Sequence, residues 1–252
     1  MNPGPGSDNR YASSMRGMGE TGAVGAVSRR GSHAQPDQVD LIRIISGKNR
    51  SALRWAAKAH AGQKRKGPDD TEDIYLLHPV AVATVLAGAG ADRDIVCAGV
   101  LHDTVEDGDI TLEDIRGEFG ANVAALVGAV TKTREFKNIR LEDAAEAVVA
   151  KCLGVSPPAR PDDACAVKAA DLTVNMTDLV LDAESHGPEH WYQVFGKKRA
   201  HRKIAHYLEL ADRLTPQLGE YPQLALAMQT RAGELRRLAA EFGWLKLEPP
   251  VE

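Results

Sequence analysis

Apolar residues recur at the three- and four-residue spacing of an α-helix from Val39 onward, and this pattern limits the fold more than any other feature of the chain. The alternation of apolar and polar residues that marks half-buried strands is largely absent. Clear examples of the helical spacing are Leu41, Ile44 and Ile45, then Leu53, Ala56 and Ala57, then Val82, Val85 and Leu86. The sequence therefore predicts an all-α protein, with a helical body over residues 39–252.

Start and stop signals divide this body into helices. Asp92 precedes an apolar run that predicts a helix over 93–106, and Thr111 with Asp114 forms a capping-box pattern for a short helix that ends near Gly120. Further helices are expected at about 121–132, 140–153, 163–182, 189–215 and 221–242. Aromatic residues near the start of the fourth of these, Trp191, Tyr192 and Phe195, are expected to pack it against the core.

Residues 1–38 differ from the body in composition. They are rich in Gly, Ser, Pro and Asn and hold few large apolar side chains, so ordering them would cost more entropy than packing could return. We expect a disordered tail over 1–38 and one domain over 39–252.

Composition also excludes several classes of protein. No stretch approaches the ~20 apolar residues of a membrane span, and the formal net charge of -4 argues against general nucleic-acid binding. The three cysteines, Cys97, Cys152 and Cys165, show no CxxC spacing, and no apolar run follows Arg29-Arg30 as an export signal would require. We expect a cytoplasmic protein that binds neither membranes nor nucleic acid.

The motif LHDTVED at 101–107 is the strongest local feature. In a helix, His102 and Glu106 are one turn apart, as are Asp103 and Asp107, so the four side chains would lie on two adjacent strips of one surface. Two of them could bind a metal ion while the other two face its bound water. Imidazole and carboxylate suit a first-row divalent ion such as Mn, Fe or Zn. Taken alone, however, a His-Asp pair near the end of a helix could simply cap it.

Two further polar residues follow apolar runs. His78 stands in YLLHP at 75–79, and Asp171 ends the run VKAAD at 167–171. A polar side chain in such a setting must be paired or bound to a metal, because an unsatisfied buried group is costly. Both are therefore candidate metal ligands.

Several motifs in this order resemble the HD-domain hydrolases of guanosine tetraphosphate and pentaphosphate, the RelA/SpoT family, over about residues 55–215. They are HAGQKRK at 60–66, YLLHP at 75–79, VLHDTVED at 100–107, TLEDIRGEFG at 111–120, VGAVTK at 127–132 and VKAADLTVNM at 167–176. The resemblance implies an all-helical HD-domain bundle. It also implies a hydrolase that removes the 3′-pyrophosphate of ppGpp or pppGpp to give GDP or GTP. The synthetase and regulatory regions of the long family members have no counterpart here, so we expect a small stand-alone alarmone hydrolase.

The resemblance also assigns roles to individual positions. In the family the metal, usually Mn²⁺, is held by the residues that match His78, His102, Asp103 and Asp171. The pair that matches Glu106 and Asp107 positions and activates the attacking water. The positions that match substrate-binding residues are Arg65, Lys66, Asn175, Lys203 and Tyr207.

Two departures from the family leave the substrate open. Members usually carry Arg and then His or Tyr between the Asp and the Asn of the last motif, where this chain has LTV at 172–174. The loop over 67–73 is longer and more acidic than the usual turn. The alternatives are the adenosine counterparts of the alarmones, the 2′-phosphate of NADPH, or a catalytically silent nucleotide-binding module. Glu106 and Asp107, present with all four candidate ligands, argue against a silent module.

The sequence assigns less specific roles to several other polar residues. Lys64, Lys132, Arg134 and Lys168 lie close in sequence to the motifs and could balance the charge of a substrate. His186 and His190 are four residues apart, but no carboxylate partner is obvious, so we assign them to the surface or an interface.

The amphipathic segment Leu224–Leu245 could close the bundle or mediate dimerisation, and the sequence does not choose between these. A homodimer therefore stays open.

Overall fold

The computed structural model describes residues 44, 47–66, 72–107, 109–132, 141–187 and 189–243. All of them belong to one compact unit, Pro36–Glu252. The tail expected over 1–38 and most of the loop expected over 67–73 lie outside the described residues.

The described residues form helices joined by short turns, with one small hairpin, as expected for an all-α protein. The first half contains α2 (Gly47–Ala59), β1 (Lys64–Lys66), β2 (Glu72–Ile74), α3 (Leu77–Gly88), α4 (Arg93–Leu101), α5 (Thr104–Asp107), α6 (Leu112–Phe119) and α7 (Ala121–Val130). The second half contains α8 (Leu141–Leu153), α9 (Pro161–His186), α10 (Glu189–Phe195), α11 (Lys197–Leu214), the 3-10 turn η2 (Thr215–Gln217) and α12 (Pro222–Glu241).

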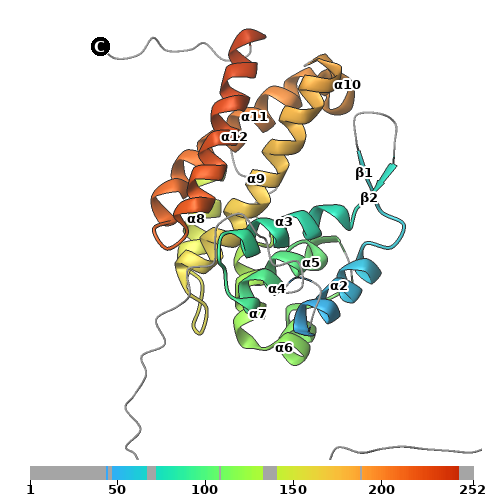
Figure 1. Cartoon of the computed structure of the whole chain (residues 1–252), viewed down its shortest axis with the longest axis vertical. Helices are drawn as coiled ribbons and strands as arrows, with labels where there is room; N and C mark the ends of the chain where they lie inside the picture. The colour runs from blue at the N-terminus through green and yellow to red at the C-terminus, as the bar shows by residue number, and fades with distance from the viewer. Residues whose placement is uncertain are drawn as a thin grey trace, which may run out of the picture. The chain divides into compact units, whose positions relative to one another are not determined.

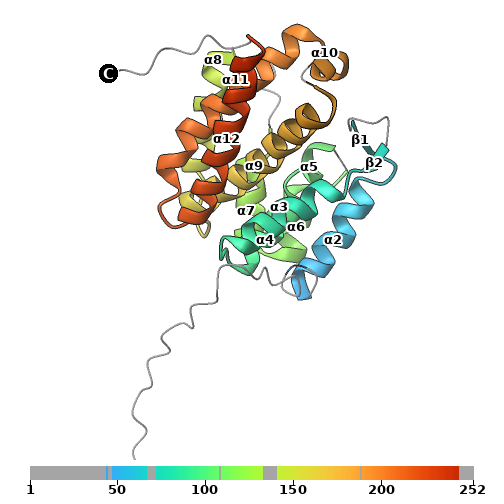
Figure 2. The same ribbon diagram turned by 45° about the horizontal axis from the view of Figure 1, so that its top comes forward.

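Helix α9 lies at the centre of this arrangement. It packs against α3, α4 and α7 on one side and against α8, α11 and α12 on the other (Figures 1 and 2). Pro161 begins the helix and Gly187, with φ 76°, ends it, which matches the preference for proline in the first turn and glycine just past the last. Because 17 of its 26 residues are buried, α9 holds its polar side chains in fixed surroundings.

Most sequence-predicted helices are confirmed, including the capping box, in which Thr111 and Asp114 bond reciprocally at the start of α6. Two predicted helices are broken. The one expected over 93–106 is interrupted at His102 and Asp103, between α4 and α5. The one expected over 189–215 is interrupted at Gly196, whose φ of 76° is a left-handed value that favours glycine.

A hairpin of two three-residue strands was not predicted. Lys64 pairs with Ile74 and Lys66 with Glu72 in antiparallel register. Strands this short cannot show an alternating pattern in the sequence.

The core contains side chains from all the long helices. Trp191 is fully buried, which confirms its structural role. Helix α12 buries Leu224, Met228 and Leu235 and packs along α9 and α11, so it closes the bundle. Dimerisation stays a prediction. None of the described helices is both long and apolar enough to cross a membrane.

Candidate metal centre

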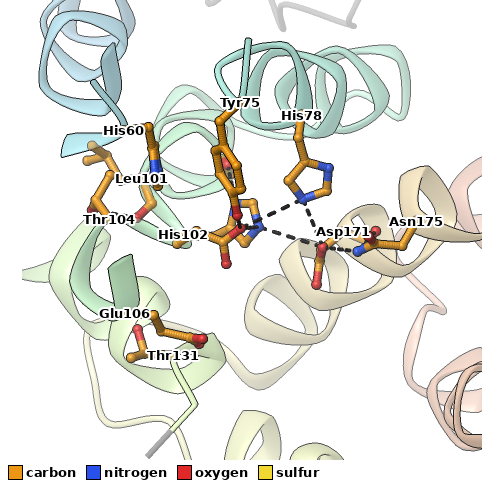
Figure 3. Close-up of polar contacts among 12 residues, drawn as sticks. His60, Tyr75, His78, Leu101, His102, Thr104, Glu106, Thr131, Asp171 and Asn175 are labelled. Carbon is orange, nitrogen blue, oxygen red and sulfur yellow. Dashed lines mark hydrogen bonds and ion pairs between the residues drawn. The ribbon is translucent and has the colours of Figure 1, made fainter. Parts of the chain in front are cut away.

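Four polar side chains from α3, α9 and the turn between α4 and α5 converge at one point. Figure 3 labels three of them, His78, His102 and Asp171. His78 lies in the first turn of α3, where Pro79 is tolerated because it needs no helical hydrogen bond. His102 and Asp103 occupy the turn between α4 and α5, and Asp171 lies in the middle of α9. The sequence-predicted ligands are thus brought together from positions 93 residues apart, and three of them are buried.

The distances between their donor atoms fit a shared cation. Nε2 of His78 lies 3.2 Å from Oδ1 of Asp171 and 3.8 Å from Oδ2 of Asp103. Nε2 of His102 lies 3.0 Å from Oδ2 of Asp103 and 3.6 Å from Oδ1 of Asp171. Ligands about 2.0–2.2 Å from one metal ion lie roughly 3–3.5 Å from each other. Within the part of the chain that the structure describes, His78, His102 and Asp171 form the one group of three such residues whose ligand atoms all lie within 4.8 Å.

The orientation of His102 is that of a metal ligand. Its Nδ1 lies 2.9 Å from the carbonyl oxygen of Gly99, so Nδ1 carries a proton and donates it, which leaves the lone pair on Nε2. Nε2 is buried and makes no hydrogen bond to any described residue. A buried acceptor directed at two carboxylates is unfavourable unless a proton or a cation lies between them.

Asp171 is held by two neighbours on its own helix. Lys168, one turn earlier, donates to Oδ2 at 2.8 Å, and Asn175, one turn later, donates to Oδ1 at 2.5 Å. The sequence suggested that Lys168 could balance the charge of a substrate. In the structure Lys168 is buried, so its charge neutralises Asp171 instead. These two bonds fix the direction of the carboxylate toward the imidazoles.

Asp103 is held from the other side. The hydroxyl of Tyr75 donates to its Oδ2 at 2.7 Å, and the Tyr75 ring stacks on His60, with ring centroids 4.3 Å apart. His60 is buried and its Nδ1 lies 2.9 Å from Oε1 of Gln63. The chain between α2 and α3 therefore supports a candidate ligand through one tyrosine.

The charges in the centre compensate each other. Burial lowers the pKa of His102, but the neighbouring carboxylates of Asp103 and Asp171 outweigh it and raise the pKa to about 10. Burial raises the pKa of Asp171, yet Lys168 and both imidazoles bring it well below its usual range. The carboxylates are thus charged, and without a metal His102 carries the compensating proton. A divalent cation bound here would displace that proton.

Glu106 lies apart from these four residues, beside Thr131 (Figure 3). Its Oε1 accepts a hydrogen bond from the backbone N–H of Lys132, and its Oε2 lies 3.5 Å from the Lys132 ammonium. The sequence predicted that Glu106 and His102 share one helical surface. This prediction is wrong, because the helix is interrupted between α4 and α5. The side chain of Asp107 lies outside the described residues.

The expected substrate-binding residues lie on three elements. Arg65 and Lys66 are on β1, but their side chains lie outside the described part of the chain. Lys203 and Tyr207 are on α11, where the Lys203 ammonium lies 5.4 Å from the Tyr207 ring centroid. Asn175 bonds Asp171 directly, a contact that the sequence did not predict.

One carboxylate that the sequence analysis missed lies elsewhere on α9. Oδ1 of Asp182 lies 3.4 Å from Nδ1 of His186 and 3.8 Å from Nε2 of His190. The signal was available, because Asp182 precedes His186 by one helical turn.

Comparison with known proteins agrees with this architecture. The family model of the HD domain matches residues 52–187, which is just over half of the chain. The chain therefore belongs to the HD-domain family. Membership implies a divalent metal, and the group of His78, His102 and Asp171 could hold one.

Particular relatives narrow this class. A guanosine-3′,5′-bis(diphosphate) 3′-pyrophosphohydrolase of Homo sapiens, MESH1, is 36% identical over 151 residues, which are 57% of this chain and 76% of that protein. A GTP pyrophosphokinase of Streptomyces coelicolor is 33% identical over 221 residues, which are 83% of this chain but 23% of that protein. The chain thus spans less than a quarter of this longer relative.

One solved structure is also similar to this chain. It is that of a metazoan ortholog of SpoT that hydrolyses ppGpp, with which this chain shares 27% sequence identity and a TM-score of 0.57. The similarity covers 79% of this chain and 98% of that one.

Proposed function

We propose that this protein is a metal-dependent hydrolase that removes pyrophosphate from the 3′ position of guanosine tetraphosphate or pentaphosphate, giving GDP or GTP. The observation that carries the proposal is the convergence of His78, His102, Asp103 and Asp171, with the buried Nε2 of His102 directed at two charged carboxylates. The activities of MESH1 and of the metazoan ortholog of SpoT support the choice of substrate.

We propose that these four residues hold one divalent ion, with Mn²⁺ preferred from the family resemblance. When bound, such an ion lowers the pKa of a coordinated water and polarises the phosphoryl oxygen. Asn175 and Lys168 orient Asp171, and Tyr75 orients Asp103. Partners of this kind, which hold ligands in place, typically change metal affinity by ~10–100-fold when removed.

Glu106 is our first choice for the general base, with Asp107 as the alternative. The backbone N–H of Lys132 holds one oxygen of Glu106 and leaves the carboxylate close to the end of α7. A base of this kind contributes ~10²–10⁴-fold to the rate. In this arrangement Lys132 supplies positive charge beside the reacting phosphoryl group.

The remaining assignments follow the resemblance. Arg65 and Lys66 on β1 would contact the nucleotide, Asn175 its sugar edge, and Lys203 with Tyr207 its phosphates. We propose one HD-domain body over 39–252, in which α10 to α12 form a C-terminal extension beyond the family match. A cytoplasmic location and a homodimer are predictions from the sequence.

The base preference stays open because of the departure at 172–174, where the buried Leu172 stands at the position at which the family usually carries arginine. The test incubates purified protein and Mn²⁺ with 3′-pyrophosphorylated guanosine and adenosine nucleotides, NADPH and GTP. We expect pyrophosphate from the guanosine alarmones. Pyrophosphate from the adenosine compounds alone, or phosphate from NADPH, would reassign the substrate within the family. Phosphate from GTP with no pyrophosphate from any compound would contradict the alarmone activity, and no product at all would favour a silent module.

A further inference from the structure

The first half of α11 carries a concentration of positive charge in a chain whose net charge is -4. Five side chains of α11 line a pocket of about 530 Å³. They are Lys198, Arg199, Arg202, Lys203 and His206. We call these five residues the α11 basic cluster.

The spacing of the cluster places it on one face of the helix. Lys198, Arg202 and His206 follow each other at intervals of four residues, and Arg199 precedes Lys203 by four. At 1.5 Å per residue the cluster extends for about 12 Å, which is longer than one phosphoryl group requires.

Three cations of this face are not paired with acids. Among the described residues, no carboxylate lies within ion-pair distance of Lys198, Arg199 or Arg202. Like charges held on adjacent turns repel each other. A multiply charged anion in the pocket would relieve that repulsion, and arginine suits phosphate because its planar guanidinium can donate two parallel hydrogen bonds.

Helix α11, which carries the cluster, packs against α9, the helix of Lys168 and Asp171 (Figures 1 and 2). Burial, together with the positive charges of Lys168 and Lys132, lowers the pKa of His206 at the C-terminal end of the cluster. Lys168 bonds Asp171 and Lys132 bonds Glu106. From His206 the cluster runs back along α11 toward its N-terminus at Lys197, and so away from these residues.

We propose that the α11 basic cluster binds the 5′-polyphosphate chain of the nucleotide and favours substrates with a longer 5′ chain. This inference rests on the proposed function, which places the 3′ phosphoryl group at the metal centre. The 3′ and 5′ positions lie on different sides of the ribose, so a nucleotide held by its 3′ ester directs its 5′ chain away from the metal. Lys203 was expected from the resemblance, whereas the pocket alone assigns Lys198, Arg199 and Arg202.

The experiment measures kcat and KM of the full chain with Mn²⁺ for guanosine 3′-pyrophosphates that carry one, two or three 5′-phosphates. The wild type should gain in kcat/KM with each added phosphate. In Arg199→Gln/Arg202→Gln, KM for the 5′-triphosphate should rise about tenfold more than KM for the 5′-monophosphate, because two partly exposed charge pairs are lost at a few-fold each. The value of kcat should change little, since these contacts are equal in the ground and transition states.

Arg93→Gln/Arg116→Gln is the matched control, because it removes the same charge from exposed positions on α4 and α6. It should keep the wild-type dependence on 5′-phosphates. An equal loss of kcat/KM along the whole series in the α11 variant would assign the arginines to the 3′ leaving group and overturn the proposal. An unchanged series would overturn it as well.

A binding measurement separates this proposal from the proposed activity. Calorimetric titration with GMP, GDP and GTP needs no hydrolysis. If the wild type releases no pyrophosphate but its affinity rises from GMP to GTP and Arg199→Gln/Arg202→Gln removes that rise, the subsite stands and the activity fails. If the affinities do not rise with 5′-phosphates, or rise equally in the variant, the subsite is wrong whatever the activity.

Discussion

Gly99 lies on α4 where this helix packs against α3. Helix α3 carries His78, and α4 ends just before His102. A Cβ added at Gly99 would lie 2.5 Å from Cδ1 of Leu86 and 3.4 Å from Cγ1 of Val82. Leu86 is fully buried and cannot move without displacing other core side chains. Overpacking of this kind costs ~1–3 kcal/mol, whereas alanine gains ~1 kcal/mol over glycine in a helix. Gly99→Ala should therefore lower the free energy of unfolding by up to about 2 kcal/mol.

Urea unfolding of the metal-free protein measures this change, with Gly233→Ala as the control. Gly233 is exposed on α12, and an added Cβ meets no atom within 4 Å, so alanine there should stabilise the protein by ~1 kcal/mol. The two variants should thus differ by ~1–3 kcal/mol. Because the added methyl group separates α3 from α4, Gly99→Ala should also bind Mn²⁺ more weakly. Equal stabilisation by both substitutions would refute the close packing.

Three further substitutions test the centre. Glu106→Gln should keep metal binding and lower turnover by ~10²–10⁴-fold in a stopped assay; loss of metal with activity would make Glu106 a ligand. Asn175→Ala should weaken Mn²⁺ binding by ~10–100-fold in a competition titration, since Asp171 loses a donor; unchanged affinity would limit Asn175 to the substrate. Lys168→Met should destabilise the metal-free protein by ~3 kcal/mol, because Asp171 is left as a buried charge with one partner fewer. Added Mn²⁺ should recover part of that loss, and an unchanged urea midpoint would contradict the pairing.

Helical periodicity predicts the long helices well because their buried faces repeat every turn. It does not predict the break at His102, because side-chain bonds contribute to it. Nδ1 of His102 bonds the carbonyl of Gly99, and Oγ1 of Thr104 bonds that of Leu101 at 2.7 Å. Neither bond produces a periodic signal.

The candidate ligands could be selected from the sequence, because each polar residue follows an apolar run. Their supporting contacts could not. The bond from Tyr75 to Asp103 depends on how the segment before α3 folds against the turn after α4. From the sequence alone, Lys168 would be interpreted as a surface charge. Only the packing around α9 shows that it is buried beside Asp171.

The central claim is that one divalent ion, held by His78, His102, Asp103 and Asp171, is required for hydrolysis at the 3′ position. The direct measurement is metal content by mass spectrometry, together with pyrophosphate release from ppGpp, for the wild type and for His102→Ala after loading with Mn²⁺. We predict about one ion per chain and release of pyrophosphate for the wild type, and neither for the variant, because the ion loses a ligand that the fold holds in place. Full pyrophosphate release by a His102→Ala protein that binds no metal would contradict the account.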